Sequence, residues 1–169
     1  LVEVIFNNKN IGGEAINLAI EKLDTDLILI SENDLEYLPD WQKSMIMAFN
    51  NIPNLGQLSP FSPFPQVEMG EVWEEKPFSK IIKFNNYKIY ETVEHGNVGT
   101  TCMIINSVAK VVKWNSRIDN STGNVFNFPD DGRYSLDIKK LGYRVAWSGA
   151  YNVINWGHNI YTWLKDENY

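Results

Sequence analysis

The spacing of apolar residues along the first part of the chain predicts strands that alternate with helices. A β-branched and aromatic run at Val2–Phe6 predicts a first strand. An apolar face at helical spacing follows the pair Gly12-Gly13 and consists of Ile16, Ala19, Ile20 and Leu23. The uninterrupted apolar run Leu27–Ile30 then predicts a strand buried on both faces, as in a parallel sheet. Together these segments have the length of one strand-helix-strand unit, about 30 residues.

The later pattern predicts further helices, while strands dominate the middle of the chain. Helices are expected from Pro39 to Ile52, from Ser107 to Trp114 and from Asp131 to Leu141, strands at 55–59, 101–105, 143–147 and 151–156, and a hairpin at 81–84 and 87–93. Residues 115–127 are predicted to be a polar loop. We therefore expect an α/β fold with a mixed sheet flanked by helices and a small antiparallel insertion within residues 66–98.

Composition and charge narrow the classes of protein that fit this pattern. The 169 residues are 44% hydrophobic and 21% charged, which indicates one globular domain over residues 1–169 rather than a disordered chain. A net charge of −6 argues against a nucleic-acid partner, which would need a basic face. The single cysteine, Cys102, excludes an internal disulfide. No signal peptide and no apolar run of about 20 residues is present, which favours the cytoplasm.

Acidic residues follow the predicted strand at 27–30. Glu32, Asn33 and Asp34 come directly after it, and in open α/β sheets ligands bind beyond the carboxyl ends of strands. Carboxylate and amide oxygens are the donors that hard divalent cations prefer. A metal site is one interpretation of this segment. An ordinary polar turn is the other, and the spacing alone does not separate them.

Three further segments could carry chemistry. Asp130 and Asp131 stand where a helix is predicted to begin, so they could be catalytic carboxylates or simply cap the helix. His158 follows the last predicted strand and could bind a metal, although a lone histidine is as easily a packing residue. Gly12 and Gly13 precede a helix and could admit a phosphate, but their spacing matches neither the dinucleotide fingerprint nor the P-loop.

Taken in chain order, these segments resemble glycosyltransferase family 2, the inverting transferases with the GT-A fold. In that family a glycine-rich turn and an Asn-bearing helix precede a strand ending in Asp-x-Asp, and a Pro-x-Trp helix, a Gly-led strand, a Glu-Asp pair, a Gly-Tyr-Arg segment and a metal-binding His follow. The matching segments here are Asn10–Asn17, Glu32–Asp34, Leu38–Trp41, Gly99–Ile105, Asp130–Asp131, Leu141–Val145 and His158. The resemblance covers Leu1 to His158 and implies a Rossmann-like GT-A sheet.

The resemblance also implies a reaction and a set of site residues. The reaction is transfer of a sugar from a nucleotide-diphosphate donor to the hydroxyl of a carbohydrate or lipid-linked acceptor, with inversion, as in polysaccharide biosynthesis. Asp131 would be the catalytic base, and Asp34, His158 and Glu32 would hold Mn²⁺ or Mg²⁺ on the leaving diphosphate. The donor would be bound by Gly12, Gly13, Asn17, Glu32, Asn33 and Asp34, and the acceptor by Asp130, Gly99, Thr100 and Trp156.

Three departures from the family pattern carry expectations of their own. Glu32 replaces the first Asp of the metal motif, so Asp34 is the safer ligand, and Asp130 replaces a Glu. The family begins with a strand-helix-strand segment that holds the nucleotide base, and this chain opens after it, so we expect the 169 residues alone to bind nucleotide poorly.

A cytoplasmic location is expected, with peripheral attachment to the inner face of a membrane as a variant of it.

Two other classes of function stay open at this point. A carbohydrate-binding module without catalysis would also suit the aromatic content of 13% and the acidic loops. A nucleotidyltransferase on a related α/β fold is the second alternative. It usually carries a glycine-rich, basic phosphate loop at its first strand, and no such loop is present in this sequence.

Overall fold

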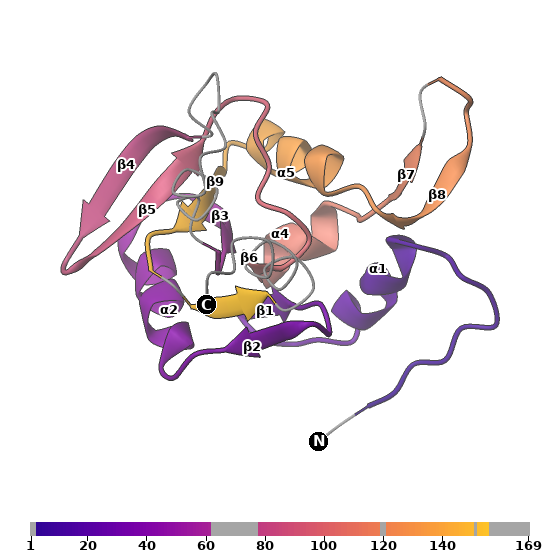
Figure 1. Cartoon of the computed structure of the whole chain (residues 1–169), viewed down its shortest axis with the longest axis horizontal. Helices are drawn as coiled ribbons and strands as arrows, with labels where there is room; N and C mark the ends of the chain where they lie inside the picture. The colour runs from indigo at the N-terminus through magenta and orange to yellow at the C-terminus, as the bar shows by residue number, and fades with distance from the viewer. Residues whose placement is uncertain (1–2, 62–77, 119–120, 151, 156–169) are drawn as a thin grey trace, which may run out of the picture.

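The computed structural model describes residues 3–61, 78–118, 121–150 and 152–155. In chain order the elements are α1 (Glu14–Ile20), β1 (Leu27–Ile30), β2 (Leu35–Tyr37), α2 (Trp41–Asn51), β3 (Leu55–Ser59), β4 (Phe78–Phe84), β5 (Tyr87–Thr92), β6 (Cys102–Ile105), α4 (Asn106–Val111), β7 (Ser116–Ile118), β8 (Val125–Pro129), α5 (Asp131–Lys140), β9 (Arg144–Ser148) and β10 (Val153–Asn155). In the part of the chain that the structure describes, two or more strands follow each helix (Figure 1).

A six-stranded sheet in the order β1-β6-β3-β9-β5-β4 forms the centre of the molecule. Its strands β3 and β9 run parallel, and its other neighbouring pairs are antiparallel. The predicted fold class, a mixed sheet flanked by helices, is therefore confirmed. The predicted hairpin is also present, as β4 and β5, and it extends the main sheet through the pairing of β5 with β9.

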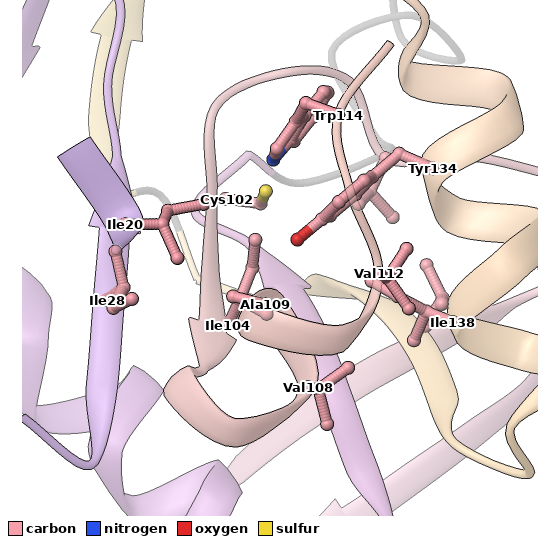
Figure 2. Packing of buried hydrophobic residues seen from close by; sticks show 12 residues of the cluster. Ile20, Ile28, Cys102, Ile104, Val108, Ala109, Val112, Trp114, Tyr134 and Ile138 are labelled. Carbon is pink, nitrogen blue, oxygen red and sulfur yellow. The ribbon is translucent and has the colours of Figure 1, made fainter. Parts of the chain in front are cut away.

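Helices cover both faces of this sheet, and each face has its own apolar core. On one face α2 packs Met45 and Ala48 against Leu55 and Leu58 of β3. On the other face, residues from α1, α4 and α5 pack against β6 and β9. Figure 2 shows this second core, in which the Trp114 and Tyr134 rings stack with centroids 3.8 Å apart. The result is a three-layer arrangement of helix, sheet and helix.

Helix α5 forms as its local sequence predicts. The Asp130 side chain accepts a hydrogen bond from the Arg133 backbone N–H, which caps the first turn. Lys139 and Lys140 lie in the last turn, where positive charge is favourable. Gly142 then adopts a φ of 85°, a conformation that suits glycine and ends the helix.

Three sequence predictions are wrong. Within the described residues 3–6, the expected first strand has no sheet partner and is not a strand, because apolar alternation becomes a strand only where a neighbour accepts its hydrogen bonds. Strand β1 is not buried in a parallel sheet but lies at the sheet edge, paired antiparallel with β6. The predicted polar loop at 115–127 contains β7 and the start of β8, which pair with each other.

Among the helices that the structure describes, none combines the length and the apolar character that crossing a bilayer requires.

Candidate functional site

Glu32 is held at the end of β1 by the neighbouring strand. The hydroxyl of Thr101 donates a hydrogen bond to Glu32 Oε2 at 3.1 Å and accepts one from the Glu32 backbone N–H at 3.4 Å. Thr101 immediately precedes β6, which pairs with β1, so sheet pairing brings these two residues together. Sequence reasoning missed Thr101, although it directly follows the predicted site residues Gly99 and Thr100. The Glu32 carboxylate therefore has a defined position.

Asp34 has an unsatisfied carboxylate oxygen. Its Oδ1 is fully buried and, among the residues that the structure describes, has no hydrogen-bond partner. A buried carboxylate oxygen without a partner is costly, so it needs a hydrogen-bond donor or a cation from outside the described residues. This is the donor chemistry that a hard divalent cation would satisfy.

The described residues do not by themselves complete a metal site. No group of three or more His, Cys, Asp or Glu side chains suited to a metal ion occurs within 3–61, 78–118, 121–150 and 152–155. The third predicted ligand, His158, lies outside the described residues, as does Trp156, the predicted acceptor contact. Among the described residues, the predicted metal ligands are therefore Glu32 and Asp34, which lie in one loop.

The two aspartates at the start of α5 differ in their contacts. Asp130 caps the helix through a 3.0 Å bond from the Arg133 backbone N–H, which is the structural role that sequence reasoning offered as the alternative to catalysis. Asp131 accepts a 2.8 Å bond from the Gly132 backbone N–H and is half-buried. Because Asp130 already serves as the cap, the fold does not require a second carboxylate at Asp131.

Cys102 lies between the two acidic segments. Its side chain is fully buried, and burial raises the pKa of the thiol to about 12; a hydrogen bond from Gln57 opposes this rise, and the charges of Asp131 and Glu32 add to it. Both carboxylates therefore lie close enough to act electrostatically on one thiol. The start of β6 has contacts toward both acidic segments, since Thr101 bonds Glu32 and Gln57 bonds both Cys102 and Ser135 of α5. The thiol itself is inert core, as its position in an apolar strand predicts.

Gly13 and Asn17 lie on the same side of the sheet and pack against the segment that precedes β7. A Cβ at Gly13 would come within 2.4 Å of the Asn115 carbonyl oxygen, so only glycine fits there. The Asn17 side chain donates to the Trp114 carbonyl at 2.8 Å and accepts from the Trp114 N–H at 2.9 Å. Asn115 in turn accepts a bond from the Asp130 N–H, which connects the start of α1 to the start of α5.

The other predicted donor and acceptor contacts lie in loops. Gly12 has a φ of 57°, and its N–H donates to the Asn10 side chain at 3.0 Å. Asn33 is exposed beside Asp34. Gly99 has a φ of 77°, and its N–H donates to the Asn97 side chain at 3.1 Å. The Thr100 carbonyl accepts a bond from the Cys102 thiol. These loop contacts direct the chain into β6 at the point where Glu32 is held.

We expect Asn17→Ala to destabilise the protein. Both halves of the Asn17 amide bond the backbone of buried Trp114, so the variant leaves a donor and an acceptor without partners and costs about 2 kcal/mol. Urea unfolding followed by tryptophan fluorescence measures this loss. Asn51→Ala is the matched control, since that exposed amide bonds only a carbonyl one turn earlier in its own helix. Equal stability of the two variants would contradict the packing role of Asn17.

Comparison with protein-family models gives one match. The model described as "Glycosyl transferase family 2" matches residues 1–112, which is more than half of the chain and includes Gly12, Gly13, Asn17, the Glu32–Asp34 loop and β6. No curated protein and no solved structure matches the chain.

Proposed function

The chain belongs to glycosyl transferase family 2, and from this membership we propose that it transfers a sugar from a nucleotide-diphosphate donor to an acceptor hydroxyl with inversion at the anomeric carbon. One observation beyond the family supports this reaction. Glu32 is bonded by Thr101, and the next residue, Cys102, is joined through Gln57 to Ser135 on the helix that begins with Asp131, so hydrogen bonds connect the two acidic segments across the fold. A reaction that needs a cation on one side of the sugar and a base on the other requires such a pair.

Asp131 is the catalytic base in this proposal. The acceptor hydroxyl must lose its proton as it attacks, so a carboxylate has to lie on the face of the sugar opposite the leaving diphosphate. Asp131 is half-buried, is not needed as the helix cap, and is oriented by the Gly132 N–H. Asp130 beside it would bind the sugar or the acceptor with the carboxylate oxygen that does not cap α5, together with Gly99, Thr100 and Trp156.

Asp34, Glu32 and His158 would hold Mn²⁺ or Mg²⁺. The Oδ1 of Asp34, buried and without a partner among the described residues, fits a cation ligand, and Glu32, already bonded by Thr101, would assist it or bind the ribose. The ion would supply positive charge to the departing diphosphate. Gly12, Gly13 and Asn33 would contact the donor through backbone and side-chain polar groups, whereas Asn17 would act there indirectly through its bonds to Trp114.

The proposal also includes the substrates and the cellular location of the reaction. The donor is a nucleotide-diphosphate sugar, and the acceptor is a carbohydrate or lipid-linked hydroxyl. No nucleic-acid partner is proposed, because the net charge of −6 disfavours a polyanion. The reaction would take place in the cytoplasm or at the inner face of a membrane, where a lipid-linked acceptor can be reached.

Release of nucleoside diphosphate tests the proposal directly. The protein is incubated with a panel of nucleotide sugars, with Mn²⁺ or with EDTA, and the liberated diphosphate is measured; NMR of the product then reports its anomeric configuration. Because the chain alone is expected to bind nucleotide poorly, each donor is supplied at high concentration. We then expect turnover with at least one donor, loss of turnover in EDTA, and an inverted product. A retained configuration would exclude the inverting mechanism.

Ligand binding to the same protein distinguishes a transferase from a carbohydrate-binding module and from a nucleotidyltransferase. Thermal shifts are recorded with free sugars, with nucleoside diphosphates and with nucleoside triphosphates, each with and without Mn²⁺. Stabilisation by free sugar alone, independent of metal and nucleotide, would indicate a carbohydrate-binding module. Pyrophosphate release from a triphosphate and a sugar phosphate would indicate a nucleotidyltransferase.

A further inference from the structure

Gln57 is a polar side chain at the centre of the sheet. It lies in β3, between β6 and β9, and is fully buried. Its Oε1 accepts a hydrogen bond from the Ser135 hydroxyl of α5 at 2.9 Å, and its Nε2 donates to the Cys102 thiol of β6 at 3.2 Å. The amide therefore joins a helix to a neighbouring strand through the interior of the protein.

A β-bulge turns Gln57 toward α5. The register of β3 against β9 shifts between Leu55 and Gln57. Leu55 and Leu58 both pack in the core beneath α2, whereas Gln57, one of the two residues between them, bonds Ser135 of α5 on the opposite side of the sheet. Strand alternation without a bulge would put Leu55 and Gln57 on the same face. The bulge therefore orients the Gln57 amide toward α5.

The bonds continue from Gln57 to both acidic segments of the site. Ser135 lies one helical turn after Asp131 on α5. The Cys102 thiol donates to the Thr100 carbonyl at 3.3 Å, and the adjacent Thr101 holds the Glu32 carboxylate. The series Ser135, Gln57, Cys102 and Thr100, which we call the buried relay, therefore spans the distance between the helix that carries Asp131 and the loop that carries Glu32.

Packing alone does not require a glutamine at this position. The residues on this face of the sheet include Cys102, Ile104, Ile138 and Val145, and an apolar side chain would fill the space without the desolvation cost of an amide. The amide makes two hydrogen bonds that an apolar side chain could not make, and these bonds fix α5 and β6 relative to each other.

We propose that Gln57 is a positioning residue, which through the buried relay sets the place of Asp131 relative to the Glu32–Asp34 loop. This inference rests on the proposed transferase function, since it assigns the relay to the geometry of that reaction. An error of about 1 Å in the placement of a reacting group can reduce turnover 100-fold. Gln57 touches no reacting atom, so its effect should be on kcat and not on ligand affinity.

Gln57→Met tests the proposal, with steady-state kinetics on the full chain. The substitution keeps the side-chain length and removes both bonds. We expect kcat to fall about 10-fold, while the donor KM and the Mn²⁺ dependence stay within about twofold of the unsubstituted protein, because Thr101 still holds Glu32. Unchanged kcat would overturn the proposal, and so would a parallel loss of kcat and Mn²⁺ affinity.

Thr92→Val is the matched control. Its hydroxyl is also buried in this sheet and donates to the Val145 carbonyl at 3.1 Å, but it bonds neither β6 nor α5. We expect this variant to lose stability and keep kcat. If Thr92→Val lowered kcat as much as Gln57→Met, the effect would be general destabilisation and the positioning role would be wrong.

Ser135→Ala gives a second variant should Gln57→Met fail to fold. It removes one bond of the relay and leaves Gln57 in place, so the same selective loss of kcat is expected, and full activity would overturn the proposal. The outcome for the unsubstituted chain separates the two levels of inference. Absence of sugar transfer in that protein refutes the proposed function, whereas transfer with normal kcat in both relay variants refutes the role of Gln57 alone.

Discussion

Asp131→Asn is expected to reduce sugar transfer by about 10²- to 10⁴-fold, the range that a general base contributes. An amide cannot take the proton from the acceptor hydroxyl. The asparagine oxygen can still accept the bond from the Gly132 N–H, and Asp130 still caps α5, so the helix should keep its position. Binding of Mn²⁺ and of the donor should be nearly unchanged. The loss should therefore appear in kcat, measured by release of nucleoside diphosphate.

Asp137→Asn is the control for loss of charge on the same helix. Asp137 forms surface ion pairs with Arg133 and Lys140 and lies on a later turn of α5. Those pairs lower the pKa of its carboxyl, although burial opposes the shift, and they contribute little to stability. We expect full turnover from this variant. Normal turnover in Asp131→Asn, or a similar loss in both variants, would remove Asp131 from the role of base.

Asp34→Ala is expected to weaken Mn²⁺ binding by more than about 100-fold, because loss of a direct ligand should weaken binding more than loss of a residue that only orients a ligand. Isothermal titration calorimetry of the full chain measures the affinity. Asp24→Ala is the control, since it removes an exposed carboxylate that precedes β1, at the other end of that strand. An isotherm that matches the unsubstituted protein would exclude Asp34 as a ligand.

In the absence of metal, Asp34→Ala is expected not to reduce the stability of the protein. Asp34 Oδ1 is buried and unpartnered among the described residues, so its removal relieves the cost of an unpaired carboxylate. In EDTA we expect Asp34→Ala to be at least as stable as the unsubstituted protein. In Mn²⁺ the unsubstituted protein should gain stability by mass action and the variant should not. A large destabilisation of Asp34→Ala in EDTA would indicate a structural role for this carboxylate instead.

Local signals explain why much of the fold could be predicted. Helix α5 has its cap at Asp130 and its terminating glycine at Gly142 within a few residues of each end. The β4–β5 hairpin turns at Asn85, which has a φ of 48°, a conformation that asparagine tolerates better than most residues. In both cases the information lies within about four residues of the element that it defines.

The failures share a different cause. The run at residues 3–6 has strand-like composition but no partner within the described chain, and β1 is apolar although it lies at the sheet edge. The pairing of β7 with β8 brings together two short segments that lie within or beside a polar stretch of the chain. Whether a segment becomes a strand, and which neighbour it has, depends on residues distant in sequence.

The candidate site divides in the same way. Residue types and their order were enough to identify the family, and the resemblance then selected Glu32, Asp34 and Asp131, whose roles stay predictions. The contacts that orient them are tertiary. Thr101 reaches Glu32 because β1 and β6 pair, and Gln57 reaches Ser135 because a bulge turns it toward α5. Sheet order and register set these contacts, and no local pattern in the chain encodes either of them.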